Sequence, residues 1–341
     1  MLAARLARVS SLPVTQLIIP QIRGSVILKT GNSANLSISR CYVQQFKDRT
    51  TRLGRLNKTV IGTEASAAPE AAFNLGKGAV AGGAVLGLGA LCYYGLGLSS
   101  QPGILENSMV WPEYVKERIR STYMYFGGSV AITAATALSV FRSPTMLRMV
   151  SGNSIMAIGA SLVAMIGSGM LVQSLPYEPG FGKKQLAWMA HTAILGAVIA
   201  PICLLGGPIL MRASWYTAGV VGGLSTVAAC APSDRFLNMG GPLAIGLGVV
   251  FASSLGSMFL PPTGALGAGL YSISLYGGLL LFSGFLLYDT QRIVRKAETH
   301  SPYAPVPYDP INASISIYLD TVNIFIRIAT ILAGGGGNRR R

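Results

Sequence analysis

Two aspartates near the C-terminal end of the chain stand in apolar sequence, where carboxylates are rare. Asp289 follows "SGFLLY", and Asp320 lies within "SIYLDTVNIFIRIAT". A charged residue at the centre of a membrane span costs about 2.5–3.5 kcal/mol on insertion scales, so its presence indicates a function. Two carboxylates close together in a medium of low dielectric constant do not both ionise easily, and they can hold a proton between them. Deprotonated, they offer oxygen ligands to a hard cation such as Ca²⁺, with backbone carbonyls and water completing the shell.

The composition places these residues in a membrane protein. Hydrophobic residues make up 51% of the 341 positions and charged residues only 11%, against about 25% charged in a soluble domain. Stretches of about 20 apolar residues can cross the hydrocarbon layer as helices. The candidate spans cover residues 79–98, 122–141, 154–173, 186–210, 215–231, 242–260, 266–288 and 313–333. The sequence therefore predicts an all-α, polytopic helix bundle with about eight spans and a tight turn at "MRAS", residues 211–214.

The order of the last two spans should bring the aspartates together. Asp289 ends one span and Asp320 lies in the first third of the next. Consecutive spans run antiparallel, so both carboxylates should lie near the same membrane face at similar depth. Asn323 and Arg327 follow Asp320 at i+3 and i+7, and this polar face must turn to the bundle interior. Two roles stay open: an ion or proton site, or a structural one in which Asp320 pairs with Arg327 or a backbone amide.

The N-terminal region has a different character. Residues 1–43 are basic, contain Ser and have no acidic residue, which is typical of a mitochondrial transit peptide; a disordered basic tail is the alternative. Cleavage would remove five of the basic residues that contribute to the net charge of +15. We expect a flexible polar segment over 44–76, an extra span with an interfacial helix over 77–120, and a flexible basic tail over 334–341.

Other conspicuous residues favour structural roles. His191 is a single imidazole within a span, as expected of a hydrogen-bonded core residue. Asp309 precedes Pro310 and the last span, and aspartate followed by proline is a common helix start. Glycines four residues apart predict close helix packing. These pairs are Gly78 with Gly82 and Gly83 with Gly87.

The segments "LLYDTQRI" and "YDPINASISIYLDTVNIFIRIAT" resemble the last two helices of the transmembrane Bax inhibitor motif family. Upstream blocks, among them "GALCYYGLGLS" and "SLGSMFLPP", resemble the mitochondrial branch of that family. The resemblance implies a seven-helix core over 121–333, with pH-sensitive calcium flux and restraint of apoptosis. For the mitochondrial branch it also implies an inner-membrane location, cristae organisation, cytochrome c retention and calcium–proton exchange. The paired aspartates of the family fall on Asp289 and Asp320.

One feature of the family is missing. Bacterial-type members latch the aspartate pair with an arginine on the second core helix, but residues 154–173 carry no charge here. Either Arg327 or a loop arginine such as Arg148 then replaces the latch arginine, or the latch of this protein differs from that of the family.

Taken together, the sequence predicts a multi-pass mitochondrial inner-membrane protein that exchanges Ca²⁺ for protons, without a cofactor and without enzymatic activity. Asp289 and Asp320 would bind the cation, Asn323 would position Asp320, and Arg327 would tune it. Expected partners are the lipid bilayer, respiratory or protease proteins of the inner membrane, and cytochrome c, but not nucleic acid. The alternative is a non-transporting scaffold that shapes cristae, with the aspartates only holding helices together.

Overall fold

Helices are the regular secondary structure in the described part of the computed structural model. It describes residues 69–96, 98–99, 103–152, 155–232 and 234–335. The predicted transit peptide, 1–43, lies outside the described residues, as does most of the predicted basic tail. No strand occurs among the described residues, so the predicted all-α class is confirmed.

The chain forms a succession of helices joined by short connections. An N-terminal helix spans Pro69–Gly95. The labelled helices that follow are α3 (Ile104–Ser108), α4 (Glu113–Arg142), α5 (Pro144–Val150), α6 (Ile155–Ser174), α7 (Lys183–Ile199), α8 (Gly207–Cys230), α9 (Gly240–Phe259), α10 (Ala265–Ser272), α11 (Gly278–Thr299) and α12 (Pro310–Gly335). A 3-10 helix, Ala200–Leu205, follows α7, and a π-helical turn, Ile273–Gly277, joins α10 to α11.

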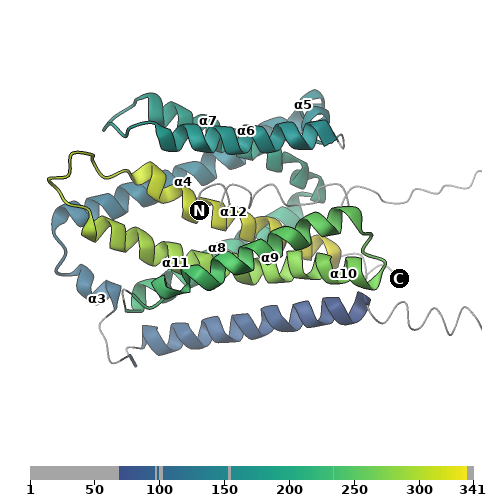
Figure 1. Ribbon diagram of the computed structural model, residues 1–341, viewed down its shortest axis with the longest axis horizontal. Coiled ribbons are helices and arrows are strands. Elements are labelled where there is room, and N and C mark those ends of the chain that lie inside the picture. The colour runs from purple at the N-terminus through teal and green to yellow at the C-terminus, as the bar shows by residue number, and fades with distance from the viewer. Residues whose placement is uncertain (1–68, 97, 100–102, 153–154, 233, 336–341) are drawn as a thin grey trace, which may run out of the picture.

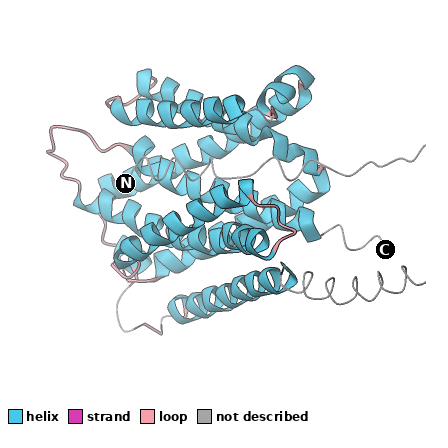
Figure 2. Ribbon diagram, turned by 45° about the vertical axis from the view of Figure 1, so that its right-hand side comes forward, coloured by secondary structure: helices cyan, strands magenta, loops and turns pink. Residues whose placement is uncertain are grey.

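The helices stack in layers around α12. Figure 1 shows α5, α6 and α7 along the top of the view, α4 and α12 beneath them, and α8 to α11 below. The helix Pro69–Gly95 lies along the opposite edge, and the turned view in Figure 2 keeps this order. Of the apolar window in α12, 78% is buried inside the protein, against 6% in Pro69–Gly95. The helix that carries Asp320 is therefore the centre of the bundle.

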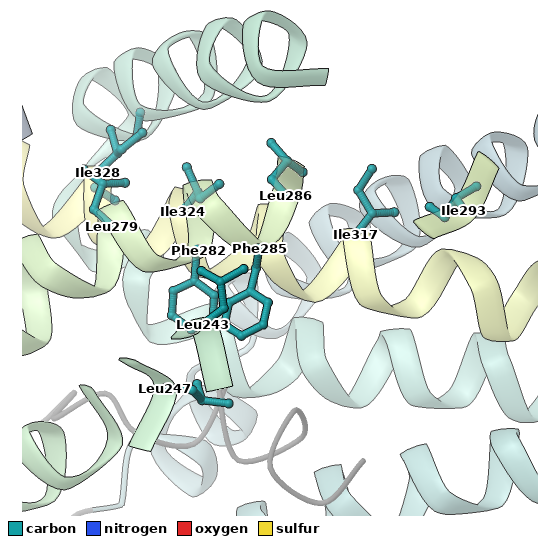
Figure 3. Packing of buried hydrophobic residues seen from close by; sticks show 12 residues of the cluster. Leu243, Leu247, Leu279, Phe282, Phe285, Leu286, Ile293, Ile317, Ile324 and Ile328 are labelled. Carbon is teal, nitrogen blue, oxygen red and sulfur yellow. The ribbon is translucent and has the colours of Figure 1, made fainter. Parts of the chain in front are cut away.

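Two apolar clusters hold α12 on opposite sides. On one side Tyr318 and Leu319 pack with Trp188 of α7. On the other, Ile317 and Ile324 pack with residues of α11 such as Leu286 (Figure 3). Lipid tails are as apolar as these side chains, so the gain on packing comes from close van der Waals contact more than from leaving water.

Seven described helices are long and apolar enough to cross a membrane. α8 corresponds to the predicted span 215–231 and has 24 residues, but it is not among the seven. It has sufficient length and packs against α11 and α12. Tyr, Trp, Ser, Thr and Arg lower its hydropathy.

Several predicted boundaries are corrected. At the start of the described residues the chain is already helical at Pro69, so residues 69–76 of the segment 44–76, which we expected to be flexible, belong to the first helix. The interfacial helix and the second span form one 30-residue helix, α4, which crosses the expected boundary at 120. "MRAS" lies within α8, because the chain turns earlier, at Gly206, where φ is +94°. Only glycine adopts that conformation readily.

The glycine prediction was half right. A Cβ on Gly83 would lie 2.4 Å from Leu280 of α11, and one on Gly87 would lie 3.9 Å from Leu224 of α8. On Gly78 or Gly82, a Cβ would have no described atom within 4 Å. Gly83 and Gly87 thus face the bundle, and the other pair faces outward.

Candidate ion site

The contacts of Arg327 fix the register between α11 and α12. The guanidinium carbon of Arg327 lies 4.5 Å from the centroid of the Phe282 ring. Asp289 lies seven residues after Phe282, and Asp320 lies seven residues before Arg327. Seven residues are about two turns and return a helix to nearly the same face. Arg327 also reaches Ser274 and Gly278, so its contacts set the register to within about two turns. Because the two helices are antiparallel, this register brings Asp289 and Asp320 toward the same part of the bundle.

Both carboxylates are fully buried, with side chains that are 0% exposed. Asp320 is the eleventh residue of α12, about 15 Å from its start. The same rise places Asp289 at a comparable distance from the C-terminal end of α11. We predicted that Asp289 would end its span, but α11 continues to Thr299. Both helices therefore extend about 15 Å beyond the aspartates toward the loop 300–309.

An arginine that the sequence analysis did not select lies beside the pair. Nη1 of Arg292 is 3.9 Å from Oδ1 of Asp289, one helical turn away, and the Arg292 side chain is 45% exposed. Arg148, the loop alternative, lies in α5, which packs mainly against α4. The i,i+3 spacing in "YDTQR" could have drawn attention to Arg292. It was overlooked because the predicted span ended at residue 288.

Asn323 and Arg327 bond to each other. Asn323 Nδ2 donates to the Leu319 carbonyl at 2.9 Å, and Asn323 Oδ1 accepts from Arg327 Nη1 at 2.9 Å. Arg327 Nε also donates to the carbonyl of Ser274 at 3.2 Å. Both side chains are 0% exposed. The predicted inward polar face of α12 is therefore present, and Asn323 contacts Arg327 through its amide oxygen.

The carboxylates of Asp289 and Asp320 would not complete a calcium site by themselves. Among the described residues, no group of three or more His, Cys, Asp or Glu side chains is placed to hold a metal ion. Two carboxylates supply at most four oxygens, whereas Ca²⁺ takes six to eight. Backbone carbonyls and water would have to supply the rest.

The loop between α11 and α12 is fastened at both ends. Asp309 Oδ1 accepts the backbone N–H of Asn312 at 2.9 Å, which confirms the predicted helix cap. Its other oxygen, Oδ2, lies 2.6 Å from Nζ of Lys184 in α7, and the Lys184 side chain is only 1% exposed. At the opposite end, Arg118 of α4 donates to the carbonyls of Ala297 and His300 at 2.9 and 2.7 Å. A cation at a helix C-terminus also interacts favourably with the helix dipole.

Three aromatic side chains, from α4, α7 and the loop between α6 and α7, pack against one another. The Tyr125 ring packs edge-on against Trp188 at 5.1 Å and against Tyr177 at 6.4 Å between centroids. Tyr177 belongs to the loop between α6 and α7. Burial and a hydrogen bond with Tyr125 raise the pKa of the Tyr177 phenol to about 12.

His191 agrees with its structural prediction. Its side chain is fully buried in α7, and Nδ1 lies 2.8 Å from the hydroxyl oxygen of Ser168 in α6. It belongs to the contact between α6 and α7.

The fold and the buried pair define a class, the polytopic helical membrane proteins with carboxylates at the bundle centre. Within that class, residues 115–338 match the family described as "Inhibitor of apoptosis-promoting Bax1". The match covers more than half of the chain, and the chain belongs to this family. The resemblance seen in the sequence is thereby confirmed.

Individual relatives extend the comparison. The chain is 52% identical to the growth hormone-inducible transmembrane protein of Rattus norvegicus over 348 residues, which covers 100% of both proteins. It is 30% identical to an uncharacterized protein of Helicobacter pylori over 242 residues, covering 69% of this chain and 94% of the relative. Identity to Bax inhibitor 1 of Rattus norvegicus is also 30%, over 235 residues that cover 67% and 90% of the two chains.

Proposed function

We propose that this protein moves Ca²⁺ across the mitochondrial inner membrane in exchange for protons, using the carboxylates of Asp289 and Asp320. The observation that carries the proposal is the burial of two carboxylates, Asp289 and Asp320, on helices that pack against each other. Burying a carboxylate is costly, and the cost is best offset when the oxygens bind a cation or share a proton.

The pair couples the two ions by competition. Ca²⁺ binds well only when the carboxylates are ionised, and a proton on either oxygen removes part of the charge that attracts the cation. A lower pH on one side of the membrane therefore releases Ca²⁺ there, and a higher pH on the other side favours its binding. The guanidinium of Arg292, half-exposed beside Asp289, would repel the cation and so weaken its binding to that carboxylate.

The test is Ca²⁺ uptake by liposomes that contain the purified full chain, with and without a pH gradient. Asp320→Asn removes a carboxylate from the pair with almost no change in volume. Asp234→Asn is the matched control, because Asp234 is exposed in the connection between α8 and α9. We expect wild type and Asp234→Asn to couple uptake to the gradient, and Asp320→Asn to lose about tenfold or more.

Two outcomes would contradict the proposal. If Asp320→Asn is folded and transports like wild type, the pair is not the transport site. If wild type itself is silent, the scaffold becomes the better proposal. Circular dichroism and size-exclusion chromatography of each variant in detergent establish that the folded proteins are being compared.

A specific surface favours the scaffold as a second candidate. The outward face of Pro69–Gly95 presents Gly78 and Gly82, and small residues let another membrane helix approach closely. Inner-membrane respiratory or protease proteins are the partners we would expect there, and cytochrome c would bind at the membrane surface. Enlarging Gly78 to Leu should then disturb cristae in cells and leave Ca²⁺ flux in liposomes unchanged; loss of flux instead would point back to the transporter.

The location is part of the proposal. It rests on the basic, acid-free residues 1–43, and a fluorescent protein fused to this segment should be imported into mitochondria and the segment cleaved. A fusion that stays in the cytosol would contradict the location without affecting the proposed ion site.

A further inference from the structure

A buried arginine lies two turns beyond the aspartate pair, on the side away from the loop 300–309. The side chain of Arg327 is 0% exposed and is the largest of the fully buried side chains. Its Nη1 contacts Asn323 and its Nε contacts the Ser274 carbonyl, whereas Nη2 is buried and has no hydrogen-bond partner among the described residues. A guanidinium has five N–H donors. That of Arg327 is hydrogen-bonded through Nε and Nη1 and not through Nη2 within the described residues.

Three features of the facing helix fit this one side chain. The π-helical turn Ile273–Gly277 departs from the α-helical hydrogen-bond pattern, and the Ser274 carbonyl within it accepts from Arg327 Nε. A Cβ on Gly278 would lie 2.1 Å from Nε, so only glycine leaves room for the guanidinium. Phe282 offers the face of its ring, a favourable site for a cation. We call Ser274, Gly278, Phe282 and Asn323 the arginine cradle.

Polar side chains continue on the far side of the cradle. The Ser274 hydroxyl lies 2.6 Å from that of Ser254 in α9, and the Ser257 hydroxyl donates to the Ser254 carbonyl at 2.8 Å. Ser254 and Ser257 are 0% exposed. Buried polar groups therefore extend from the aspartates to α9. We call Asp289, Asp320, Asn323, Arg327, Ser274 and Ser254 the polar seam.

We propose that Arg327 is the internal barrier of this seam, a tethered cation that stops Ca²⁺ at the aspartate pair from passing toward α9 while its guanidinium occupies the cradle. The inference deepens the proposed function and rests on it. Arg327 is a positioning and charge-selecting residue, and the cation is received by the two carboxylates.

Electrostatics and ligand supply both support the barrier. The level of Arg327 is about 10 Å from that of the pair along the helix axis. At the pair, two carboxylate charges in contact with the cation outweigh the repulsion from Arg327. As the cation approaches the guanidinium, halving the separation from about 10 to about 5 Å at an effective dielectric constant of about 20 lowers its occupancy by a further factor of about a hundred or more. In addition, Asn323 Oδ1 accepts from Arg327, so this oxygen is engaged while the guanidinium stays in place. Passage across the seam then requires the guanidinium to leave the cradle.

The test measures Ca²⁺ influx into liposomes without a pH gradient. Arg327→Gln removes the charge, and Arg212→Gln, an exposed arginine of α8, is the matched control. We expect Arg327→Gln to admit Ca²⁺ at least about tenfold faster than wild type, and the addition of Asp320→Asn to abolish that leak. Arg327→Lys, which keeps a charge and loses the planar fork, should leak less than Arg327→Gln. A purely structural arginine would make the two variants equally defective.

Gly278→Ala provides a second route to the same question. This substitution keeps Arg327 in the sequence but displaces its guanidinium, so liposomes with Gly278→Ala should also admit Ca²⁺ without a pH gradient. Gly278→Ala serves as the test if Arg327→Gln does not fold. A folded Arg327→Gln with wild-type flux and wild-type dependence on the gradient overturns the barrier alone, provided that Asp320→Asn is inactive. Silence of wild type and of every variant overturns the proposed function together with the barrier.

Discussion

The ion pair between Lys184 and Asp309 gives an asymmetric prediction for stability. The Asp309 side chain is 21% exposed, whereas Lys184 is 1% exposed and also donates to the Leu175 carbonyl, at 2.7 Å. Asp309→Asn would leave a buried ammonium without its counter-charge, at a cost of about 3–5 kcal/mol in the free energy of unfolding. Lys184→Met leaves the partly exposed carboxylate of Asp309, which still caps α12. We therefore expect the free energy of unfolding to fall by only about 1–2 kcal/mol.

The double variant tests the reasoning. Asparagine is as good a helix cap as aspartate, so Asp309→Asn should leave the cap on α12 intact. With Lys184→Met already present, adding Asp309→Asn should then cost little, and the double-mutant cycle should show strong coupling. The assay is unfolding in mixed micelles with increasing SDS, followed by circular dichroism. Additive effects, or a larger loss for Lys184→Met than for Asp309→Asn, would refute this account of the pair.

Two further predictions concern packing and titration. Gly83→Leu should destabilise the docking of Pro69–Gly95 by about 1–3 kcal/mol, because the new side chain would clash with Leu280. Gly82→Leu brings the same gain in helix propensity and should not destabilise the docking. Equal effects of the two substitutions in the SDS assay would contradict the outward placement of Gly82. Since the pKa of Tyr177 is raised by burial from 10.0 to about 12, its contribution to stability is complete below pH 10 and falls as the pH rises toward about 12. Tyr177→Phe should reduce the loss of stability at alkaline pH in the same assay. A pH profile like that of the wild type would contradict this role of Tyr177.

The two helices that carry the aspartates were predictable from the sequence, and the contacts around these residues were not. Hydropathy locates the two helices, and the short connection between them requires that they run antiparallel, which brings Asp289 and Asp320 together. The polar run "DTQRIVRK" after Asp289 was interpreted as the end of the helix. Polar residues can continue a helix outside the hydrocarbon layer, so both the extension to Thr299 and the neighbouring Arg292 were missed.

Which faces of the helices meet is the information that periodicity lacks. Gly78 with Gly82 and Gly83 with Gly87 have the same spacing, yet only the second pair faces the bundle. The choice depends on side chains of other helices, such as Leu280, that are distant in the sequence. The cradle of Arg327 was hidden for the same reason, because a π-helical turn and a glycine at position 278 acquire meaning only when the guanidinium is placed against them.

The double fastening of the loop 300–309 sets limits on how this connection can be engineered. Arg118 holds the carbonyls at its beginning and Lys184 holds Asp309 at its end, so a residue inserted at either anchor would shift one aspartate-bearing helix against the other. Between the anchors Tyr303 is 95% exposed. A short epitope placed after Tyr303 would therefore be read by antibodies from one side of the membrane only, and would reveal the orientation of the protein without disturbing its centre.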